Sequence, residues 1–490
     1  YNVKVISIKF TKNKSRLTVI TLSALFIFNL RDVLFPKNFQ QDDIAELEPI
    51  FFNKLICAFN YGDQHPLFSS LIWISSRTFE WPEYIISGII ILFAVFTITL
   101  FFDFLEKLFN YNLALLGSAL LISSPIFNTY TVGLKQYNFE IFTTVLCLWF
   151  FQNYQNKEIK NKYFLYFITA SVILFLLSFV SAVPIAILIL FLFKSNKKSI
   201  ILVLSLIVLT IPLLDNLLSK LSRVSNGGYW DNFFINTMSF SKFLESFYFL
   251  NQLFMKSIFP IFPHSIFVLL IFISLITVIF RRNEFILFSF VGMMLLYVFS
   301  MMKFYPLGGG RTDLLFLPFS IILFLNFIDL IFSKSKIFSD YKIFSYTAIV
   351  YLLAVMFTVS IYYKNEPISN VLADVNIKFN STNEAIIVTE EQSKAFLYYS
   401  KKEYGYGYSP TGDCGVKNNI DNLYISKQFE KVEPFSDIKN YPTAVLVGIE
   451  LPNTIGQLRI VSEQLIDEGY MLISEKTYEG SLKLLYFEKG

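Results

Sequence analysis

Charged residues are scarce in this sequence. Asp, Glu, Lys and Arg make up only 16% of its 490 residues, whereas 54% are hydrophobic. Soluble domains carry about 25% charged residues, so this composition argues against an ordinary soluble enzyme and predicts a polytopic membrane protein. The net charge of +4 is too small to indicate a nucleic-acid partner.

Cysteine and histidine are also rare. The three cysteines, Cys57, Cys147 and Cys414, are too few and too widely spaced to predict a disulfide framework or a zinc site. The two histidines, His65 and His264, form no ligand motif. The sequence therefore shows no metal-ligand set and no evident cofactor site.

Eleven apolar runs are candidates for membrane-spanning helices, because a span needs roughly 20 apolar residues and fewer where the bundle shields its ends. The run 163–193 is too long for one helix, and "SFVSAVP" supplies a break before Pro184. The chain starts basic and then apolar, without a small-residue cleavage site, so we expect the first span to be retained. The predicted spans are residues 17–35, 84–102, 112–127, 138–152, 163–178, 180–193, 199–215, 257–280, 285–302, 312–332 and 343–363.

Basic residues predict the orientation. With the N-terminus in the cytoplasm, the N-terminal tail and the loops "QNKEIKNK", "KSNKKS", "RRNE" and "SKSKIFSDYK" all fall inside, as the positive-inside rule requires. Merging the runs 163–178 and 180–193 would move "RRNE" and "SKSK" outside, so the charges favour eleven spans. We therefore expect a multi-pass protein of the plasma (inner) membrane with its C-terminal segment outside the cytoplasm.

Residues 364–490 differ in pattern from the transmembrane domain predicted at 1–363. "EAIIVTE", "NLYISK" and "AVLVGIEL" are typical of strands. "EQSKAFLYYSKK" and "TIGQLRIVSEQLIDEGY" have helical spacing, the second ending at Gly469, and "MLISEKTYEGSLKLLYFEKG" is typical of a closing hairpin. We predict a small extracytoplasmic α/β domain. It contains no GxGxxG and no P-loop, so no nucleotide site is assigned to it.

The first long outer loop, residues 36–83, starts with the acidic segment "QDDIAELE". An enzyme that transfers a sugar to a hydroxyl needs a carboxylate to accept the hydroxyl proton, and Asp42 or Asp43 is a candidate for this base. Alternatively, the segment is a solvated loop, or the cap of a helix starting near Ile44, whose first turn would favour Glu46.

The same loop contains "YGDQHPLFSSLIWISSRTF". Pro66 suits the first turn of a helix, and Asp63 and His65 just before it are candidates for substrate binding. The alternative is an interfacial amphipathic helix with a polar cap and no chemistry. Such a helix would present Leu67, Leu71, Ile74 and Phe79 to the membrane.

"TYTVGLKQYNFEIF" marks the outer start of the predicted fourth span. Lys135 is a candidate for contacting an anionic head group, with Tyr137 and Glu140 beside it. Lys and Tyr are also ordinary anchors at a membrane interface, and Glu140 in a first helical turn suits the helix dipole. Both interpretations fit the sequence.

A glycine-rich loop, "KFYPLGGGRTDLLFLP", precedes the predicted span 312–332. The three glycines 308–310 would let the backbone approach a ligand closely, and Arg311 would stand near a helix N-terminus, where anions bind. A guanidinium suits phosphate through two parallel hydrogen bonds, and Lys303 and Tyr305 are nearby. The alternative is a flexible turn with a snorkelling Arg, but three consecutive glycines favour the binding interpretation.

On the predicted topology, all four segments reach the same side of the membrane. Lipid-linked phosphosugar chemistry needs a base for the acceptor and cations for the phosphate leaving group. Transporters usually place ionisable residues near the bilayer midplane, and these spans hold almost none. The pattern therefore favours surface chemistry over a lipid-linked glycan transporter or flippase. An inactive accessory membrane subunit is the other alternative.

These motifs resemble those of lipid-linked-sugar glycosyltransferases of the GT-C fold, in particular the family-39-like branch related to protein O-mannosyltransferases and the lipid A aminoarabinose transferase. In that family an Asp-Glu pair follows the first span, where this chain has Asp42 and Asp43. "DQHPLF" resembles a D-x-H-P-P-L-like segment with one Pro missing, and "KQY" resembles an Arg-x-Tyr segment with Lys135 in place of Arg. "YPLGGGR" matches a YP-glycine-Arg loop, and the resemblance covers about residues 15–365.

The resemblance implies an inverting transfer of a sugar from a polyprenyl-phosphate donor to a hydroxyl of a protein, lipid or glycan acceptor. Asp42 would be the catalytic base, with Asp43 in place of the usual Glu. Arg311, Lys135 and Lys303 would meet the phosphate. Some relatives of the fold use a divalent metal ion, for which this sequence shows no ligand set.

Overall fold

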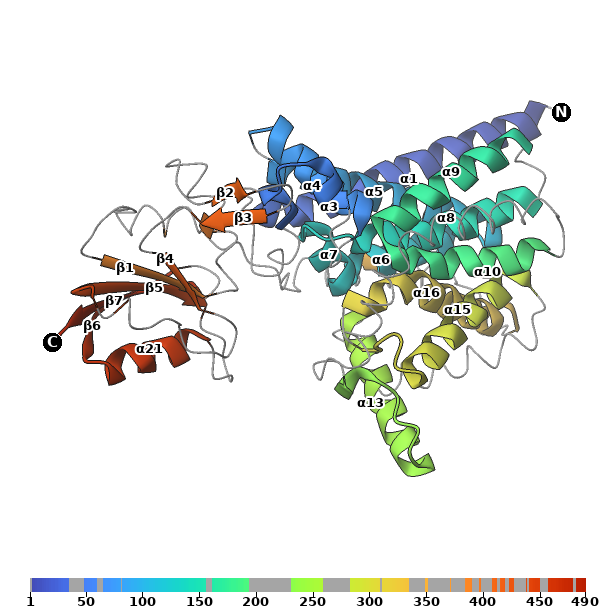
Figure 1. Cartoon of the computed structure of the whole chain (residues 1–490). Helices are drawn as coiled ribbons and strands as arrows, with labels where there is room; N and C mark the ends of the chain where they lie inside the picture. Colours follow the sequence, from blue (N-terminus) through green and yellow to red (C-terminus); the bar gives the residue numbers. More distant parts are fainter. Residues whose placement is uncertain are drawn as a thin grey trace. The chain divides into compact units, whose positions relative to one another are not determined.

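Figure 1 shows the computed structural model of the chain. The chain folds into two compact units, one of residues 1–31 and 87–362 and one of residues 32–86 and 363–490. The structure describes residues 2–34, 48–59, 65–80, 82–155, 161–193, 231–258, 283–308, 311–334, 349–350, 371, 384–389, 396–397, 408–411, 415–418, 423–426, 438, 440–449, 457–478 and 482–490.

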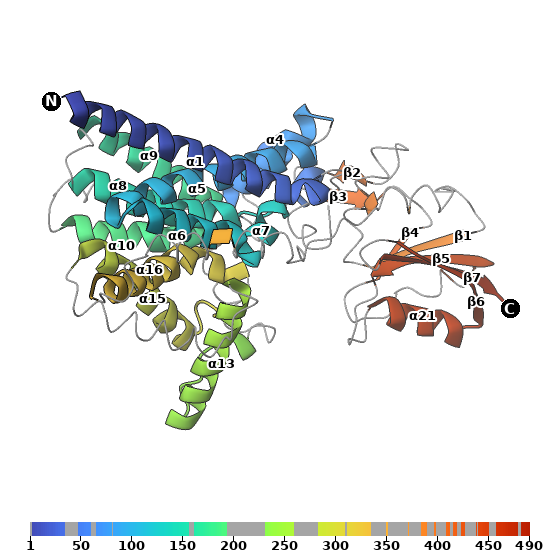
Figure 2. The same cartoon turned by 180° about the vertical axis from the view of Figure 1, so that it is seen from behind.

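The first unit is a bundle of apolar helices (Figures 1 and 2). In hydrocarbon every backbone N–H and C=O must be satisfied within the protein, and a helix does this within one segment. Short 3₁₀ helices join the longer ones: η3 (Phe179–Ser181), η5 (Asp231–Phe233) and η6 (Arg311–Phe316). The helices are α1 (Asn2–Leu34), α5 (Pro82–Leu108), α6 (Tyr111–Ser123), α7 (Pro125–Val132), α8 (Tyr137–Gln155), α9 (Asn161–Leu177), α10 (Ala182–Phe193), α13 (Phe240–Ile258), α15 (Glu284–Met301) and α16 (Leu317–Lys334).

Helix α8 is the central packing element of this bundle, since it packs against α9, α10, α15, α16 and η6. Aromatic side chains fill these interfaces. The centroid of the Phe151 ring lies 5.3 Å from that of Phe285 and 5.6 Å from that of Phe191, both edge to face. Such pairs stabilise a core beyond the apolar area that they bury. The abundant phenylalanine of the sequence thus forms the contacts between helices.

A bend of 56° separates α6 from α7. Pro125 begins α7, and a proline has no N–H with which to continue the preceding helical ladder. The Asn128 side chain donates to the carbonyl oxygens of Ile122 and Ser124, both at 2.8 Å. The Ser124 carbonyl oxygen also accepts the Asn128 backbone N–H at 3.1 Å. The side-chain bond to Ile122 gives a partner to a carbonyl group at the C-terminal end of α6. The bend directs α7 toward the turn that carries Lys135.

The predicted spans agree in position with helices wherever the structure describes them. Within the described residues, three helices are long and apolar enough to cross a membrane, or four if the bent pair α6–α7 is one span. The spans predicted at 199–215, 257–280 and 343–363 lie wholly or mostly outside the described residues, so the total of eleven stays a prediction. The predicted spans 17–35, 84–102, 112–127, 138–152, 163–178, 180–193, 285–302 and 312–332 overlap α1, α5, α6–α7, α8, α9, α10, α15 and η6–α16, respectively.

The apolar run 163–193 forms two helices, and the break lies within "SFVSAVP" before Pro184, as predicted. The interruption consists of Ser178, which has extended backbone (φ −154°, ψ 120°), and of η3 after it. Pro184 lies in the first turn of α10. Proline is tolerated there because the N–H groups of a first turn have no intrahelical acceptor.

The outer loop predicted at 216–256 contains a helix, α13, that the sequence analysis did not predict. Its inward face has helical spacing, with Leu250 and Phe254 fully buried. Asn251 on the same face accepts a 2.8 Å hydrogen bond from the Tyr297 hydroxyl of α15. The polar residues between its aromatic ones concealed the 3.6-residue period. Its exposed apolar side chains are Phe240, Leu244, Tyr248 and Phe249.

The second unit contains part of the first outer loop. This part forms η2 (Glu48–Phe51), α3 (Leu55–Phe59) and α4 (Pro66–Thr78). Pro66 begins α4 as predicted. The carbonyl oxygen of Phe52 accepts hydrogen bonds from Trp73 Nε1 at 2.8 Å and Arg77 at 3.0 Å, which hold α4 on the preceding segment.

The C-terminal residues of this unit form a mixed five-stranded sheet with strand order β4-β1-β5-β7-β6. Strand β1 (Glu384–Thr389) pairs in parallel with β4 (Leu423–Ser426) and β5 (Thr443–Ile449). Strand β7 (Leu482–Lys489) pairs antiparallel with β5 and with β6 (Tyr470–Thr477). Helix α21 (Gln457–Asp467) packs on β5 and β6. A separate antiparallel hairpin joins β2 (Tyr408–Thr411) to β3 (Gly415–Asn418).

The α/β pattern predicted for this region is confirmed in its strands, in α21 and in the closing β6–β7 hairpin. Gly469 ends the helix as predicted, with a φ of +89° that glycine adopts without steric cost. The helix predicted at "EQSKAFLYYSKK" lies mostly outside the described residues. The β2–β3 hairpin was not predicted.

Candidate substrate-binding site

Lys135 lies in the turn between α7 and α8. Asn138, fully buried in the first turn of α8, holds this turn in place. Its side-chain amide donates to Thr131 Oγ1 at 3.1 Å and to the Tyr130 carbonyl oxygen at 3.3 Å. Gly133 ends α7 in an extended conformation. Because the turn is tied to both helices, the position of Lys135 is set by the scaffold.

The Lys135 side chain is buried, with 6% of its surface exposed. Among the residues that the structure describes, its ammonium group has no hydrogen-bond or ion-pair partner. Withdrawing a charge from water without a partner costs free energy. An anion that bound here would offset this cost, so Lys135 is the best candidate in the first unit for binding a negatively charged group.

Tyr137 and Glu140 lie in the first turn of α8 beside this lysine. The Tyr137 ring packs edge to face on that of Tyr130, with centroids 5.0 Å apart. Glu140 is buried, and its Oε1 accepts a 2.6 Å hydrogen bond from the Ser178 hydroxyl. This bond joins α8 to the break between α9 and α10. Glu140 therefore braces the outer start of α8 against a neighbouring segment.

The segment that begins at Arg311 packs against the same part of α8. The Thr144 hydroxyl donates to the Leu315 carbonyl oxygen at 3.1 Å, and η6 also packs against α7. The structure therefore brings together two of the four predicted segments, the α7–α8 turn and the end of the glycine-rich loop. The structure describes the backbone of Arg311, which starts η6, but not its side chain.

The described part of the glycine-rich loop is held by backbone hydrogen bonds. The Leu307 N–H donates to the Phe233 carbonyl oxygen at 2.8 Å. The Gly308 N–H donates to Asp313 Oδ1 at 2.9 Å, and Asp313 is fully buried. A carboxylate that accepts a backbone N–H makes one of the stronger hydrogen bonds in proteins. The alternative of a flexible turn does not fit these residues.

Gly308 differs from its predicted role. Its φ is +75°, and a Cβ at this position would lie 2.9 Å from the Leu250 carbonyl oxygen and 2.9 Å from Leu253 Cβ of α13. Only glycine combines this backbone conformation with so close an approach. Gly308 is therefore required for packing on α13, rather than for the approach of a ligand. Gly309 and Gly310 lie outside the described residues.

Lys303 and Tyr305 occupy different surroundings. Lys303 is exposed, and its Nζ lies 3.9 Å from Asp231 Oδ1, with both side chains 57% exposed. The Tyr305 ring packs on Phe316 of η6, with centroids 5.8 Å apart. Tyr305 thus supports the segment that follows Arg311, whereas Lys303 already has an anionic partner.

The residues predicted in the first outer loop are described only in part. Asp42, Asp43 and Asp63 lie outside the described residues. His65 is buried directly before α4, in extended backbone, and its side chain makes no capping bond to that helix. No group of three or more His, Cys, Asp or Glu that could hold a metal occurs in the described part of the chain.

Three residues that shape this region were missed by the sequence analysis: Asn138, Ser178 and Asp313. Each is a polar residue beside an interruption in a helix, and such residues commonly satisfy backbone groups there. Asn138 follows "GLKQY", Ser178 precedes "FVSAVP", and Asp313 follows "GGGRT". A polar residue beside a helix interruption could therefore have been predicted to support the backbone there, but the sequence does not show which group each residue binds.

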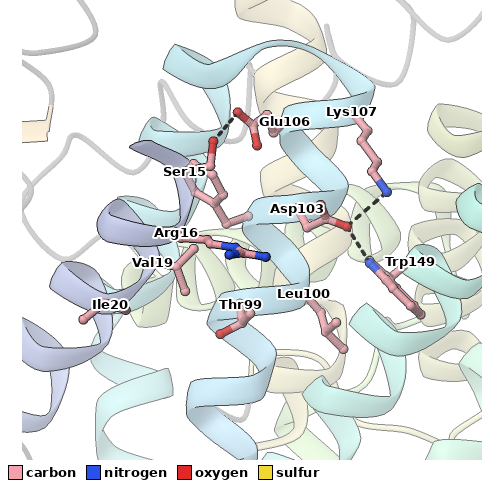
Figure 3. A pocket seen from close by; sticks show the side chains of 11 residues that line it. Ser15, Arg16, Val19, Ile20, Thr99, Leu100, Asp103, Glu106, Lys107 and Trp149 are labelled. Carbon is pink, nitrogen blue, oxygen red and sulfur yellow. Dashed lines mark hydrogen bonds and ion pairs between the residues drawn. The ribbon is translucent and has the colours of Figure 1, made fainter. Parts of the chain in front are cut away.

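A cavity of about 760 Å³ lies elsewhere in the first unit, between α1, α5 and α8 (Figure 3). Its two carboxylates have partners: Trp149 Nε1 donates 2.7 Å to Asp103 Oδ2, and Lys107 Nζ lies 3.3 Å from that oxygen. Ser15 donates 2.7 Å to Glu106. Trp149 is about 18 Å along α8 from its first residue, and none of the predicted site residues lines the cavity. It is thus separate from the candidate site.

Comparison with known proteins identifies the fold. No family model and no curated protein matches this sequence. Among solved structures, the chain is similar to one over almost its whole length, which defines it as having a GT-C type membrane fold. That structure is the crystal structure of ArnT from Cupriavidus metallidurans in the apo state, with a TM-score of 0.53 and 12% identity, covering 97% of this chain and 98% of that chain. The fold implied by the resemblance is confirmed, and the likeness concerns the fold alone.

Proposed function

We propose that this protein is a membrane glycosyltransferase that takes a sugar from a polyprenyl-phosphate donor. The observation that carries this proposal is Lys135, a buried cation without a partner among the described residues, held at the junction of α7 and α8. The ArnT-like fold supports a transferase of this general class.

The donor phosphate is the group that would pair with Lys135. The segment starting at Arg311 packs against α7 and α8, so a guanidinium from this segment is a second candidate for the same phosphate. Arg binds phosphate through a planar fork and Lys as a point charge. Two such cations would stabilise the charge that develops on the phosphate as the bond from the sugar to the phosphate oxygen breaks.

Asp42 is proposed as the base. Its carboxylate would accept the proton of the acceptor hydroxyl while the hydroxyl oxygen bonds to the anomeric carbon and the polyprenyl phosphate leaves on the opposite side, which inverts the centre. Asp43 is its neighbour in the pair and the alternative base. Asp63 and His65 are proposed to line the acceptor path. Donor and acceptor arrive from different phases, so positioning would supply much of the rate.

The proposed reaction takes place outside the cytoplasm, with the N-terminus inside and the C-terminal domain outside. This orientation rests on the basic inside loops. The acceptor is a hydroxyl of a protein, lipid or glycan. The donor and acceptor would meet at the outer rim of the bundle, where the polyprenyl chain lies among the apolar helices.

Mass spectrometry of membrane lipids tests this function. A strain lacking the protein should accumulate one polyprenyl-phosphate sugar, and the intact gene should reverse this. Asp42→Asn should leave the accumulation unreversed if Asp42 is the base, whereas Asp43→Asn should reverse it at least in part. If no lipid-linked sugar accumulates on the outer leaflet, the transferase proposal fails. Accumulation on the inner leaflet alone would instead indicate a transporter.

A further inference from the structure

Cys57, on the short helix α3, is disulfide-bonded. Cys147, on α8, is a buried free thiol. The sequence contains three cysteines, and the remaining one is Cys414. We propose that Cys57 and Cys414 form a disulfide that joins the first outer loop to the β2–β3 hairpin of the C-terminal region, and that both segments therefore lie outside the cytoplasm. The scatter of the cysteines along the sequence gave no sign of this bond.

Described neighbours of both cysteines lie close together within the second unit. Cys414 itself is outside the described residues, but the hairpin strands on either side of it end at Thr411 and begin at Gly415. Strand β2 lies against η2, and Figure 1 shows the hairpin near α3 and α4. The same η2 packs against α3, which carries Cys57.

The Cys57 end of the proposed bond is held rigidly. Cys57 is buried in a small apolar cluster with Phe52 and Ala58, and Trp73 of α4 packs on this cluster. Trp73 and Arg77 both donate to the Phe52 carbonyl oxygen. A disulfide needs its two Cα atoms within about 7 Å, so a fixed α3 would hold the hairpin in a defined place. The first outer loop would thereby be tied to a segment more than three hundred residues later in the sequence, as their numbers show.

A disulfide needs an oxidant to form, and this requirement determines on which side of the membrane the bond lies. Two thiols lose two protons and two electrons as the sulfur–sulfur bond forms. The electrons pass by thiol–disulfide exchange to the disulfide of an oxidoreductase, which is reduced to its dithiol. Such oxidants keep disulfides intact outside the cytoplasm, whereas cytosolic thiols are kept reduced. The disulfide thus places the loop and the hairpin on the exoplasmic side, by an argument independent of the basic loops and of the catalytic proposal.

Thiol counting on the full-length protein tests this inference. Intact cells are quenched with acid, which stops thiol oxidation and exchange, and the precipitated protein is then denatured and labelled with a maleimide–polyethylene glycol, with or without prior reduction. Wild type should have one reactive thiol without reduction and three with it, because Cys147 alone is free. Cys57→Ser and Cys414→Ser should each show two without reduction. The matched control, Cys147→Ser, should show none without reduction and two with it.

Mass spectrometry of an unreduced digest should find one linked pair of peptides containing Cys57 and Cys414. Three reactive thiols in unreduced wild type, or a disulfide between two copies on a non-reducing gel, would overturn the pairing. A bond that forms only after cell lysis would overturn the exoplasmic location. None of these readouts measures sugar transfer, so the disulfide can stand or fall apart from the proposed function.

Discussion

The lysines beside the two ends of helix α8, Lys107 of α5 and Lys135 of the α7–α8 turn, have opposite surroundings. At the cavity end, Lys107 pairs with Asp103 at 3.3 Å and donates to Asn153 at 2.6 Å, and Trp149 donates to the same Asp103 oxygen. At the other end Lys135 is buried, and no described residue pairs with it. The helix that separates these ends is about 28 Å long.

Whether a buried lysine has a partner in the protein distinguishes a residue that stabilises the fold from a candidate for ligand binding. A lysine that already has partners in the protein, such as Lys107, stabilises the fold and has little left with which to bind a ligand. A buried cation without a partner destabilises the free protein, and it is retained where binding an anion offsets the cost. The comparison therefore supports the proposal that substrate binds at the Lys135 end, whereas Lys107 already has partners in the protein.

Lys135→Met gives the largest expected effect. It should lower binding of a polyprenyl monophosphate and the rate of sugar transfer by about 100-fold, since a charge-assisted hydrogen bond contributes roughly 1.5–3 kcal/mol. The thermal unfolding midpoint should not fall, because the change removes a buried charge that has no described partner. Binding is measured with the protein in lipid nanodiscs, and transfer by restoration of the glycan in cells.

The matched control is Lys107→Met on α5, beside the other end of α8. It removes a lysine with two partners that is partly exposed, so stability should fall by about 1 kcal/mol or less while polyprenyl phosphate binding stays unchanged. If Lys107→Met lost binding and Lys135→Met kept it, the assignment of the two ends would be reversed.

Gly308→Ala should come next in effect. A methyl group would meet the Leu250 carbonyl oxygen and Leu253 at 2.9 Å, in backbone with φ of +75°. The steric overlap and the backbone strain together should cost about 3 kcal/mol of stability and should displace the loop that leads to Arg311. The readouts are the unfolding midpoint and polyprenyl phosphate binding.

Gly469→Ala separates the two kinds of strain. Gly469 also has positive φ, at +89°, but a Cβ there has nothing within 4 Å. Its substitution should therefore cost only about 1 kcal/mol and leave lipid binding intact. Equal losses for the two variants would mean that the packing of Gly308 on α13 contributes nothing.

Much of the fold could be predicted from the sequence, because local patterns determine it. Apolar length located the helices, and strand alternation located β1, β4 and β5. Helix α13 was missed because polar residues interrupt its inward face. The hydrogen bond that helps to hold it, from Tyr297 of α15 to Asn251 of α13, joins segments far apart in the sequence. Cys57 was given no role because three widely spaced cysteines do not predict a disulfide framework.

The candidate site was predictable in residue type more than in arrangement. Lys135 was selected for its charge, but its burial and lack of a described partner depend on packing that no local pattern encodes. Lys303 was selected on the same grounds and pairs with Asp231, 72 positions earlier by their numbers. Gly308 was expected to admit a ligand and instead admits α13. Each difference arises from contacts between segments that are far apart in sequence.

Ser178→Ala should have an intermediate effect. It removes the 2.6 Å hydrogen bond to the buried Glu140 carboxylate, and such bonds to charged groups contribute roughly 1.5–3 kcal/mol. Stability should fall by about 2 kcal/mol, with lipid binding lowered less than in Lys135→Met. Ser320→Ala is the matched control, because the Ser320 hydroxyl bonds only the Leu317 carbonyl oxygen of its own helix, and its loss should be nearly neutral. An equal effect of the two would show that the Glu140–Ser178 bond does not brace α8.

Lys303→Ala should have the smallest effect of all, and it sharpens the contrast between a paired and an unpaired lysine. Its pair with Asp231 is 3.9 Å long and well exposed, so stability should change by less than about 0.5 kcal/mol. Binding of polyprenyl monophosphate should match wild type within about twofold, because this cation already has an exposed anionic partner and water around it. If Lys303→Ala weakened binding as much as Lys135→Met, the phosphate would have to bind at the glycine-rich loop. Burial without a partner would then not identify the lysine that binds the phosphate.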